Sequence, residues 1–266
     1  MKYKINDVSK LIGISKEAIR SYEKVGIISP KRDDSNGYRT YDIEDVGIFI
    51  RSRIYKNWGF SQLEIKKLIN ETNLEETIDV LTDKEQVLQD KILEEIRILN
   101  NLKKWKKRYS EIEKLMGNFE IANSPKLYKF DCSGDSGFYE NEDVIKTTAD
   151  YILDAPYFYS GGYFKKCDNE QNWENVIFMC IDAEDKDIVK QTISENAKIM
   201  ESQNCVCTVV ETNGRNIKIQ DLDSLFEFIK LNKLSIEGKI MYIRILSIHK
   251  DRAHKVYTKV FVPINI

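Results

Sequence analysis

The amino-terminal end of this chain restricts its fold more than any other stretch. Apolar residues recur at helical spacing over residues 5–12, and Gly13 then interrupts the pattern. Ser15 is a suitable amino-terminal cap for a second short helix, which carries the basic residues Lys16 and Arg20. Two short helices joined by a tight glycine-containing turn, with basic side chains on the second, are typical of a helix-turn-helix. The pattern therefore predicts a nucleic-acid-binding motif.

A charged hairpin is expected directly after these helices. Residues 31–39 place basic residues on both sides of an acidic, turn-forming DDSN sequence that is followed by glycine. Residues 43–55 then show a helical pattern in which Val46, Ile50 and Ile54 are expected to face inward. The combination predicts a winged helix-turn-helix, with the hairpin as its wing.

Three motifs at fixed spacing link this region to a known family. Arg, Tyr and Glu stand at positions 20, 22 and 23, Gly-Tyr-Arg occupies 37–39, and Gly-Phe-Ser occupies 59–61. With these motifs, residues 3–68 resemble the start of a MerR-family transcriptional regulator. The resemblance covers about the first quarter of the chain in detail. It implies a winged helix-turn-helix that binds double-stranded promoter DNA.

The candidate DNA contacts follow partly from residue chemistry and partly from the resemblance. Arg20 has a bidentate guanidinium suited to base edges, and Ser15 can offer its hydroxyl to a phosphate at a helix start. The resemblance implies that Tyr22, Tyr38 and Arg39 contact backbone phosphates. It also implies a phosphate contact from Lys56, shortly before the Gly-Phe-Ser turn. Tyr22 fits a core tyrosine equally well, and Ser21 stands where the family often has the first of two tyrosines. The predicted DNA-binding residues are Ser15, Lys16, Arg20, Tyr22, Tyr38, Arg39 and Lys56.

A long uninterrupted helix is expected next, because residues 77–116 contain neither glycine nor proline. Its apolar residues at coiled-coil spacing are Ile78, Leu81, Leu88, Ile92, Leu99, Leu102 and Tyr109. We expect an antiparallel coiled coil between two copies of the chain, since a DNA reader with one recognition helix usually needs a second half-site. The resemblance implies the same homodimer. In the alternative, the helix packs on its own carboxyl-terminal domain. The basic run at 103–108 is expected to be a solvated face.

The carboxyl-terminal half changes to segments rich in tyrosine, isoleucine and valine, which predict strands. The expected strands are 126–132, 157–164, 175–181, 205–212, 239–248 and 255–264, and the expected helices are 140–154, 186–201 and 220–233. Gly161 and Gly162 are expected to form a bulge or bend. These elements predict an α+β domain with an antiparallel sheet, and their order is similar to the GyrI-like effector-binding domain of multidrug-sensing MerR regulators. The predicted domains are 1–75 (winged helix-turn-helix), 76–116 (dimerisation helix), 117–125 (linker) and 126–266 (effector binding).

Aromatic residues of this last domain are candidates for binding a lipophilic small molecule. For each of them a plain core position is the alternative. In multidrug-sensing relatives a buried glutamate pairs with ligand cations, but the corresponding position here is Tyr242 or Ile243, and the strand carries Arg244. A neutral or anionic ligand that meets Arg244 is therefore an alternative to a cationic drug. The predicted effector-binding residues are Tyr157, Tyr159, Tyr163, Trp173, Tyr242 and Arg244.

Charge and motifs exclude several other classes. Residues 1–70 carry 14 Lys+Arg against 9 Asp+Glu, whereas residues 117–266 carry 18 against 23, which fits a nucleic-acid-facing front. No apolar run reaches 18 residues and no signal peptide is recognisable, so we expect a cytoplasmic protein without a membrane partner. The five cysteines are expected to be buried, reduced thiols, and residues 70–120 contain no Cys or His for a metal sensor. We expect no metal, no cofactor and no catalytic residue, since phosphate-cradling and hydrolase motifs are absent.

The sequence therefore predicts a homodimeric, ligand-responsive transcriptional regulator. By resemblance it acts with RNA polymerase at a promoter and distorts the promoter DNA when its effector binds. One alternative is a ligand-sequestering protein with a weak DNA-binding head. Another is a small hydrolase with a regulatory head.

Overall fold

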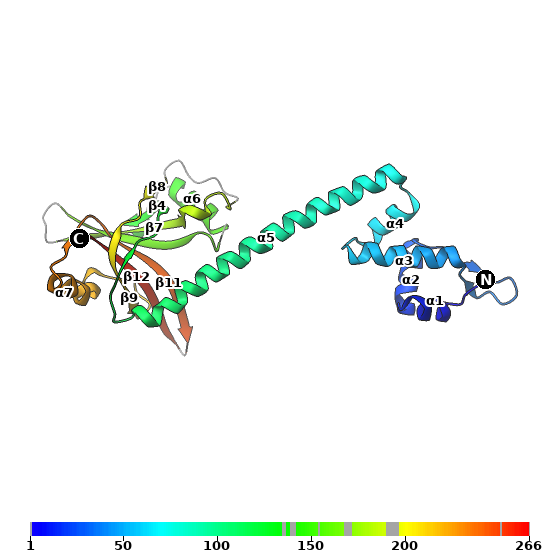
Figure 1. The fold of residues 1–266 in the computed structure, drawn as a ribbon, viewed down its shortest axis with the longest axis horizontal. Coiled ribbons are helices and arrows are strands. Elements are labelled where there is room, and N and C mark those ends of the chain that lie inside the picture. Colours follow the sequence, from blue (N-terminus) through cyan, green and yellow to red (C-terminus); the bar gives the residue numbers. More distant parts are fainter. Residues whose placement is uncertain are drawn as a thin grey trace. The chain divides into compact units, whose positions relative to one another are not determined.

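The computed structural model describes residues 2–134, 137–138, 142–153, 155–167, 172–189, 197–250 and 252–265 (Figure 1). The chain divides into two compact units, residues 1–93 and 94–266. The long helix α5 (Leu74–Leu115) begins in the first unit and ends in the second. Among the described residues, no helix is both long and apolar enough to span a membrane.

The first unit contains the predicted helix-turn-helix and hairpin. Its elements before α5 are α1 (Ile5–Ile12), α2 (Lys16–Val25), β1 (Lys31–Arg32), β2 (Arg39–Thr40), α3 (Ile43–Asn57) and α4 (Gln62–Asn70). Gly13 ends α1 in the left-handed conformation at φ 64°, where a residue with a side chain is strained. The Ser15 hydroxyl accepts a hydrogen bond from the Ala18 amide at 3.1 Å and caps α2. The two local signals in the sequence therefore produce the predicted turn.

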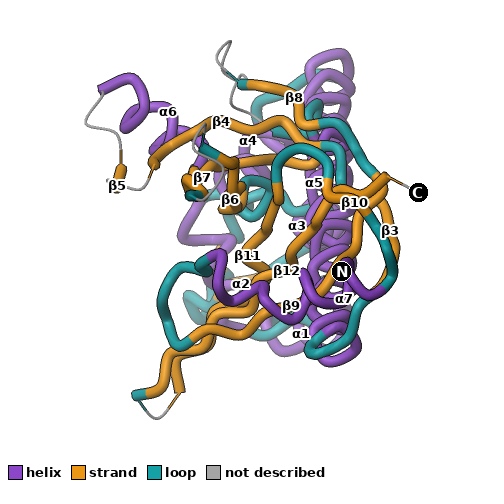
Figure 2. The backbone as a smooth tube through the Cα atoms, turned by 90° about the vertical axis from the view of Figure 1, so that its left-hand side faces the viewer, coloured by secondary structure: helices purple, strands orange, loops and turns teal. Residues whose placement is uncertain are grey.

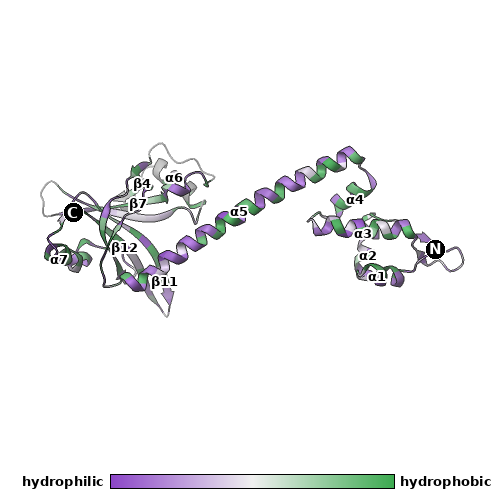
Figure 3. Cartoon of the chain, viewed as in Figure 1, coloured by the Kyte–Doolittle hydropathy of each residue, from purple (hydrophilic) through white to green (hydrophobic). Residues whose placement is uncertain are grey.

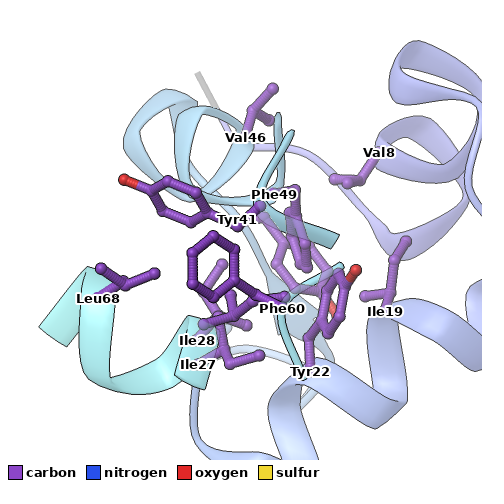
Figure 4. Packing of buried hydrophobic residues seen from close by; sticks show 12 residues of the cluster. Val8, Ile19, Tyr22, Ile27, Ile28, Tyr41, Val46, Phe49, Phe60 and Leu68 are labelled. Carbon is purple, nitrogen blue, oxygen red and sulfur yellow. The ribbon is translucent and has the colours of Figure 1, made fainter. Parts of the chain in front are cut away.

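The core of this unit combines aromatic rings with aliphatic side chains (Figure 4). Phe49 of α3 is fully buried, with the Tyr22 ring stacked at 6.1 Å between centroids and the Tyr41 ring at 5.9 Å. The predicted inward positions Ile50 and Ile54 are instead 50% and 42% exposed. That prediction was wrong because these aromatic partners bury the side of α3 that carries Phe49, so the buried stripe follows the three-residue spacing from Val46 to Phe49.

The second unit is built on one antiparallel sheet (Figure 2). Its strands are β3 (Glu120–Asn123), β4 (Leu127–Gly134), β5 (Gly137–Phe138), β6 (Tyr159–Lys166), β7 (Trp173–Asp182), β8 (Lys198–Met200), β9 (Asn204–Thr212), β10 (Ser235–Ile236), β11 (Ile240–Lys250) and β12 (Ala253–Asn265). Its helices besides the end of α5 are α6 (Glu142–Leu153), α7 (Asp223–Leu231), η1 (Ala183–Asp185) and η2 (Ile219–Leu222). The sheet order is β3-β9-β12-β11-β6-β7-β4-β5, with β8 paired to β4 and β10 to β12. All six predicted strands are present, and the α+β class is confirmed.

The sheet contains an internal duplication that the sequence analysis did not predict. A strand, a helix and a hairpin occur first as β4-α6-β6-β7 and again as β9-α7-β11-β12. In each copy the lone strand pairs with the second hairpin strand, β4 with β7 and β9 with β12. The first hairpin strands, β6 and β11, pair antiparallel at the centre and join the copies.

The two faces of the sheet have different covers. Tyr242 of β11 packs in a cluster with Leu225 and Ile229 of α7. The neighbouring Met241 and Ile243 point to the other face, in a cluster that includes Trp105 of α5. Because side chains alternate along a strand, the α7 side and the α5 side are opposite faces.

Two predictions about local structure in this unit were wrong. The predicted linker contains β3, which pairs with β9 in the sheet. The predicted helix 186–201 instead ends in strand β8, and residues 190–196 of it lie outside the described residues. Both short strands are stabilised by pairing with distant strands, a signal that local sequence patterns do not carry.

Gly161 and Gly162 form no bulge, because β6 keeps a continuous register with β7 and β11. A Cβ atom at Gly162 would lie 2.2 Å from the Tyr242 hydroxyl oxygen, and one at Gly161 would lie 2.7 Å from the Phe178 ring. The glycines therefore make room for two aromatic rings that cross β6.

Candidate DNA-binding surface and ligand-binding unit

Helix α2 presents the predicted recognition residues to solvent. Lys16 and Arg20 are exposed, while Ile19 of the same helix is fully buried. The hairpin residue Tyr38 is 71% exposed, and Lys56 near the end of α3 is also exposed. These cationic and phenolic groups are free to meet phosphates and base edges.

Arg39 and Tyr22 have additional structural roles. The Arg39 Nε atom lies 2.9 Å from a Glu23 carboxylate oxygen, which ties the hairpin to α2. The buried Tyr41 hydroxyl donates to the same carboxylate, and burial together with Glu23 raises the pKa of Tyr41. Tyr22 is only 3% exposed, so the structure supports the core alternative for its ring. Sequence reasoning named Glu23 only as part of a motif and missed its role as the shared acceptor.

Helix α2 is also held by polar contacts from the later helices. Gln62 Nε2 donates to the Ser21 hydroxyl at 2.9 Å, so the residue that departs from the family pattern links α2 to α4. Asn70 donates to the Gly26 carbonyl at 3.0 Å at the end of α2, and Arg53 donates to the Ile12 carbonyl at 2.7 Å at the end of α1. These bonds satisfy carbonyls that helix ends leave open and fix the pose of α2.

The predicted effector-binding residues do not come together. Tyr159 and Tyr163 lie on the α5 face of the sheet, in one cluster. Trp173 and Tyr242 lie in the cluster under α7, on the opposite face. Tyr157 joins a third cluster, and its buried hydroxyl has no hydrogen-bond partner among the described residues. The structure thus divides this set between the two faces of the sheet, so these six described residues do not line one common pocket.

Tyr242 and Arg244 engage polar neighbours on the α7 face. The Tyr242 hydroxyl donates to Asn175 Oδ1 at 2.7 Å, and Arg244 donates to Asn216 Oδ1 at 2.8 Å. Both line a partly enclosed cavity of about 250 Å³ that also includes Cys132. Its wall is mostly apolar, with Arg244 as its charged group.

The carboxyl end of α5 is anchored by a buried ionic network. Arg108 Nη2 lies 2.7 Å from Asp182 Oδ2, and the Tyr159 hydroxyl donates to Asp182 Oδ1 at 2.7 Å. The Trp105 ring meets the Tyr159 ring edge-on at 5.4 Å. Burial disfavours the charged form of Arg108, but Tyr159 and Asp182 outweigh it and raise the pKa of Arg108 above its usual value.

This network corrects in part the prediction that residues 103–108 form a solvated face. Lys103, Lys106 and Lys107 are exposed as predicted, whereas Lys104 and Arg108 are half-buried in the network. Lys104 contacts Asp182 and lies 2.7 Å from oxygens of Glu184 and Asp185. The three carboxylates are close enough to hold a metal ion, but the Lys104 ammonium sits among them. Burial of Lys104 lowers its pKa, and the three acids reverse this and raise the pKa overall. Basic residues of α5 thus dock the helix on its own domain.

Four cysteines, Cys132, Cys180, Cys205 and Cys207, are buried, and Cys167 is half-buried. All five are free thiols. Burial raises the pKa of Cys207 to about 12, so its thiol stays protonated near neutral pH. The four buried cysteines lie in strands, as expected, whereas Cys167 follows the end of β6 and departs from that expectation.

Comparison with known proteins bears on the helix-turn-helix. Residues 4–41 match the family model described as MerR family regulatory protein. This segment is of the MerR type. The regulator CueR of Escherichia coli O6:H1 is 36% identical over 66 residues, which are 25% of this chain and 49% of that protein. The regulator HmrR of Sinorhizobium medicae is 40% identical over 65 residues, which are 24% of this chain and 44% of that protein.

The chain thus spans about half the length, or less, of these two relatives. Among solved structures, the EcmrR–DNA complex in an open promoter complex covers 99% of both chains at 18% identity, with a TM-score of 0.37. HiNmlR bound to promoter DNA covers 43% of this chain and 90% of its own at 25% identity, with a TM-score of 0.32.

The MerR-type match contains all the predicted DNA-binding residues except Lys56. It also contains both members of the Arg39–Glu23 ion pair. The matched segment therefore coincides with the surface that α2 and the hairpin present to solvent.

Proposed function

We propose that this protein is a MerR-type transcriptional regulator that binds double-stranded promoter DNA and responds to a small-molecule effector. The observation that carries the proposal is the MerR match over residues 4–41, on which Lys16 and Arg20 project from α2 into solvent beside the hairpin. An arginine on a recognition helix suits guanine edges in the major groove. As a promoter-binding regulator it would act in the cytoplasm, and not as an enzyme.

The proposed protein is a homodimer joined through α5. Large apolar side chains on this helix stay exposed, and Figure 3 shows them as green segments among polar ones. They include the seam residues Ile78, Leu88, Ile92, Leu99, Leu102 and Tyr109. A soluble chain rarely leaves such a stripe uncovered, so a second α5 in an antiparallel coiled coil is its proposed cover. Two heads then read two half-sites of a pseudo-palindromic site.

The second unit is the proposed effector domain. Its α+β order, which the sequence relates to GyrI-like domains, supports this assignment, as do the cavities on both faces of its sheet. Effector binding is proposed to change the promoter DNA conformation, in concert with RNA polymerase. The energy for that distortion has to come from tighter effector binding to the active state.

Substitution of Arg20 tests the DNA-binding role directly. In anisotropy titrations with the promoter upstream of its own gene, Arg20→Ala should weaken binding about tenfold or more. It should also reduce the preference for the promoter over a scrambled duplex, because a base contact is lost. Arg97→Ala, an exposed arginine on α5, is the matched control and should change neither quantity. Equal promoter affinity of Arg20→Ala and wild type would refute the assignment.

A further inference from the structure

A cavity of about 320 Å³ opens on the α5 face of the sheet. Its walls come from both halves of the duplication, β4 and β6 on one side and β9, β11 and β12 on the other, with β8 at its edge. The residues that define its chemistry are Lys129, Asp131, Tyr163, Lys198, Lys239 and Met241. A volume in this range suits a small organic ligand. This cavity is separate from the one that holds Arg244.

Two ammonium groups lie close to the Tyr163 ring. Lys129 Nζ lies 4.5 Å from the ring centroid, and Lys239 Nζ lies 4.5 Å from the same centroid. The Lys129 side chain is only 6% exposed, although lysine is almost never buried without a specific reason. Its methylene groups and charge are thus built into the wall of the cavity.

The positive charge of the cavity exceeds the negative charge that faces it. Asp131 is already engaged, since Oδ1 pairs with Lys129 and Oδ2 accepts from the Tyr163 hydroxyl at 3.3 Å. The other acid in the wall, Glu201, lies 3.0 Å from Lys126. Within the described part of the chain, neither Lys198 nor Lys239 forms a salt bridge.

Burial and the excess of positive charge lower the pKa of Lys129. The Asp131 carboxylate opposes the effect of burial, and the charges of Lys239 and Lys198 lower the pKa further. A cationic ligand would add to this repulsion, whereas an anion would relieve it. The wall also contains the apolar side chains of Met241, Phe261 and Met200, together with the polar residues Ser124 and Gln203.

We propose that this cavity binds an organic anion, a carboxylate or similar acid carried on an aromatic or otherwise apolar body. The anionic group meets Lys198 and Lys239 at the rim, and the apolar body lies along Tyr163, Met241 and Phe261. That this anion is the effector rests on the proposed function. That the cavity binds an anion rests on the residues of the cavity alone.

Three probes of equal shape and different charge test the inference by isothermal titration calorimetry. They are 2-naphthoate, neutral 2-naphthalenemethanol and cationic 2-naphthylmethylammonium. The full-length protein should bind naphthoate at least about tenfold more tightly than either of the others, because only it pairs with the lysines. Equal or stronger binding of the neutral or the cationic probe overturns the proposal, and so does an absence of naphthoate binding at millimolar concentration.

Two lysine variants locate the site. Lys239→Met should weaken naphthoate binding about tenfold, and Lys129→Met should also weaken it. Lys239 is exposed, so its variant stays informative even if the buried Lys129→Met substitution disturbs folding. Lys230→Met, an exposed lysine at the end of α7, is the matched control. Unchanged naphthoate affinity of Lys239→Met overturns the assignment.

The same preparations are titrated with promoter DNA without any probe. Intact promoter binding together with failure of the naphthoate test rejects the anion site and leaves the proposed function in place. Charge-selective naphthoate binding by a protein that does not recognise the promoter supports the anion site and rejects the proposed function. The two failures are therefore distinguishable.

Discussion

At the scale of single residues, Gly162 shows how a side chain from a neighbouring strand can require a glycine. The Tyr242 ring lies across Gly162, and its hydroxyl continues to Asn175 at 2.7 Å. A methyl group at this position would lie 2.7 Å from the Val176 carbonyl oxygen as well as against the ring. Neither neighbour is the flexible end of a side chain, so backbone or ring has to move.

Gly162→Ala should therefore lower the free energy of unfolding by about 1–3 kcal/mol, the usual cost of overpacking. Gly47→Ala is its matched opposite, because Gly47 lies inside α3 and a Cβ atom there meets nothing within 4 Å. It should raise stability by about 0.5–1 kcal/mol through helix propensity. Thermal unfolding of both variants checks the pair. A Gly162→Ala protein as stable as the wild type would contradict the packing argument.

At the scale of elements, the sequence predicted what local patterns determine. The turn at Gly13, the cap at Ser15 and the six main strands each have a signal within a few residues, and the structure has them all. The short strands β3 and β8 have no such signal, because distant partners define them. The buried face of α3 was misjudged for the same reason, since Phe49 packs against the rings of Tyr22 and Tyr41, which come from outside α3.

The candidate sites divide in the same way. The exposed positions of Lys16 and Arg20 on α2 were predictable, since a helix start and a basic face suffice to place them. The lysine pair around Tyr163 was not predicted, because Lys129 and Lys239 are 110 positions apart and meet only when β4 and β11 share a sheet. Tyr159 and Tyr163 share one face of β6, as alternation along a strand requires, but sequence alone does not show which face is covered.

The anchor of α5 gives a prediction at the element scale. Asp182 is 7% exposed and neutralises the buried Arg108, so Asp182→Ala leaves that charge without its carboxylate. We expect a loss of about 3–5 kcal/mol in the free energy of unfolding of the second unit, the usual cost of breaking a buried ion pair. Glu184 is the control, since it is 74% exposed although it also pairs with Lys104. Glu184→Ala should cost at most about 1 kcal/mol.

Urea denaturation followed by circular dichroism measures both variants. A small effect of Asp182→Ala would mean that apolar contacts of α5, such as those of Ile112 and Leu115, hold the helix without the ionic network. A large loss of unfolding free energy in Glu184→Ala would show that the acids beside Lys104, and not Asp182 alone, hold α5 in place.

At the scale of the whole molecule, the cavity and the α5 anchor are linked by a pair of neighbouring strands in the second unit, β4 and β7. Lys129 of β4 is paired in register with Cys180 of β7, and Leu127 is paired with Asp182. The lysine that lines the cavity is thus two residues along β4 from the position that faces the anchoring carboxylate. A ligand that shifts β4 acts on the strand pair that holds α5, which is the proposed dimer helix.

If α5 forms the dimer, charged residues in its exposed apolar stripe should cause the two chains to dissociate. Leu88 and Ile92 are both exposed and lie one helical turn apart on the same side. The double variant Leu88→Glu with Ile92→Glu places like charges in the seam, so sedimentation velocity should show a monomer where the wild type is a dimer. Promoter affinity should fall by at least about a hundredfold, because two linked half-site contacts become one. Gln86→Glu, on the far side of α5, should stay dimeric, and a double variant that remains a dimer would show that another surface joins the two chains.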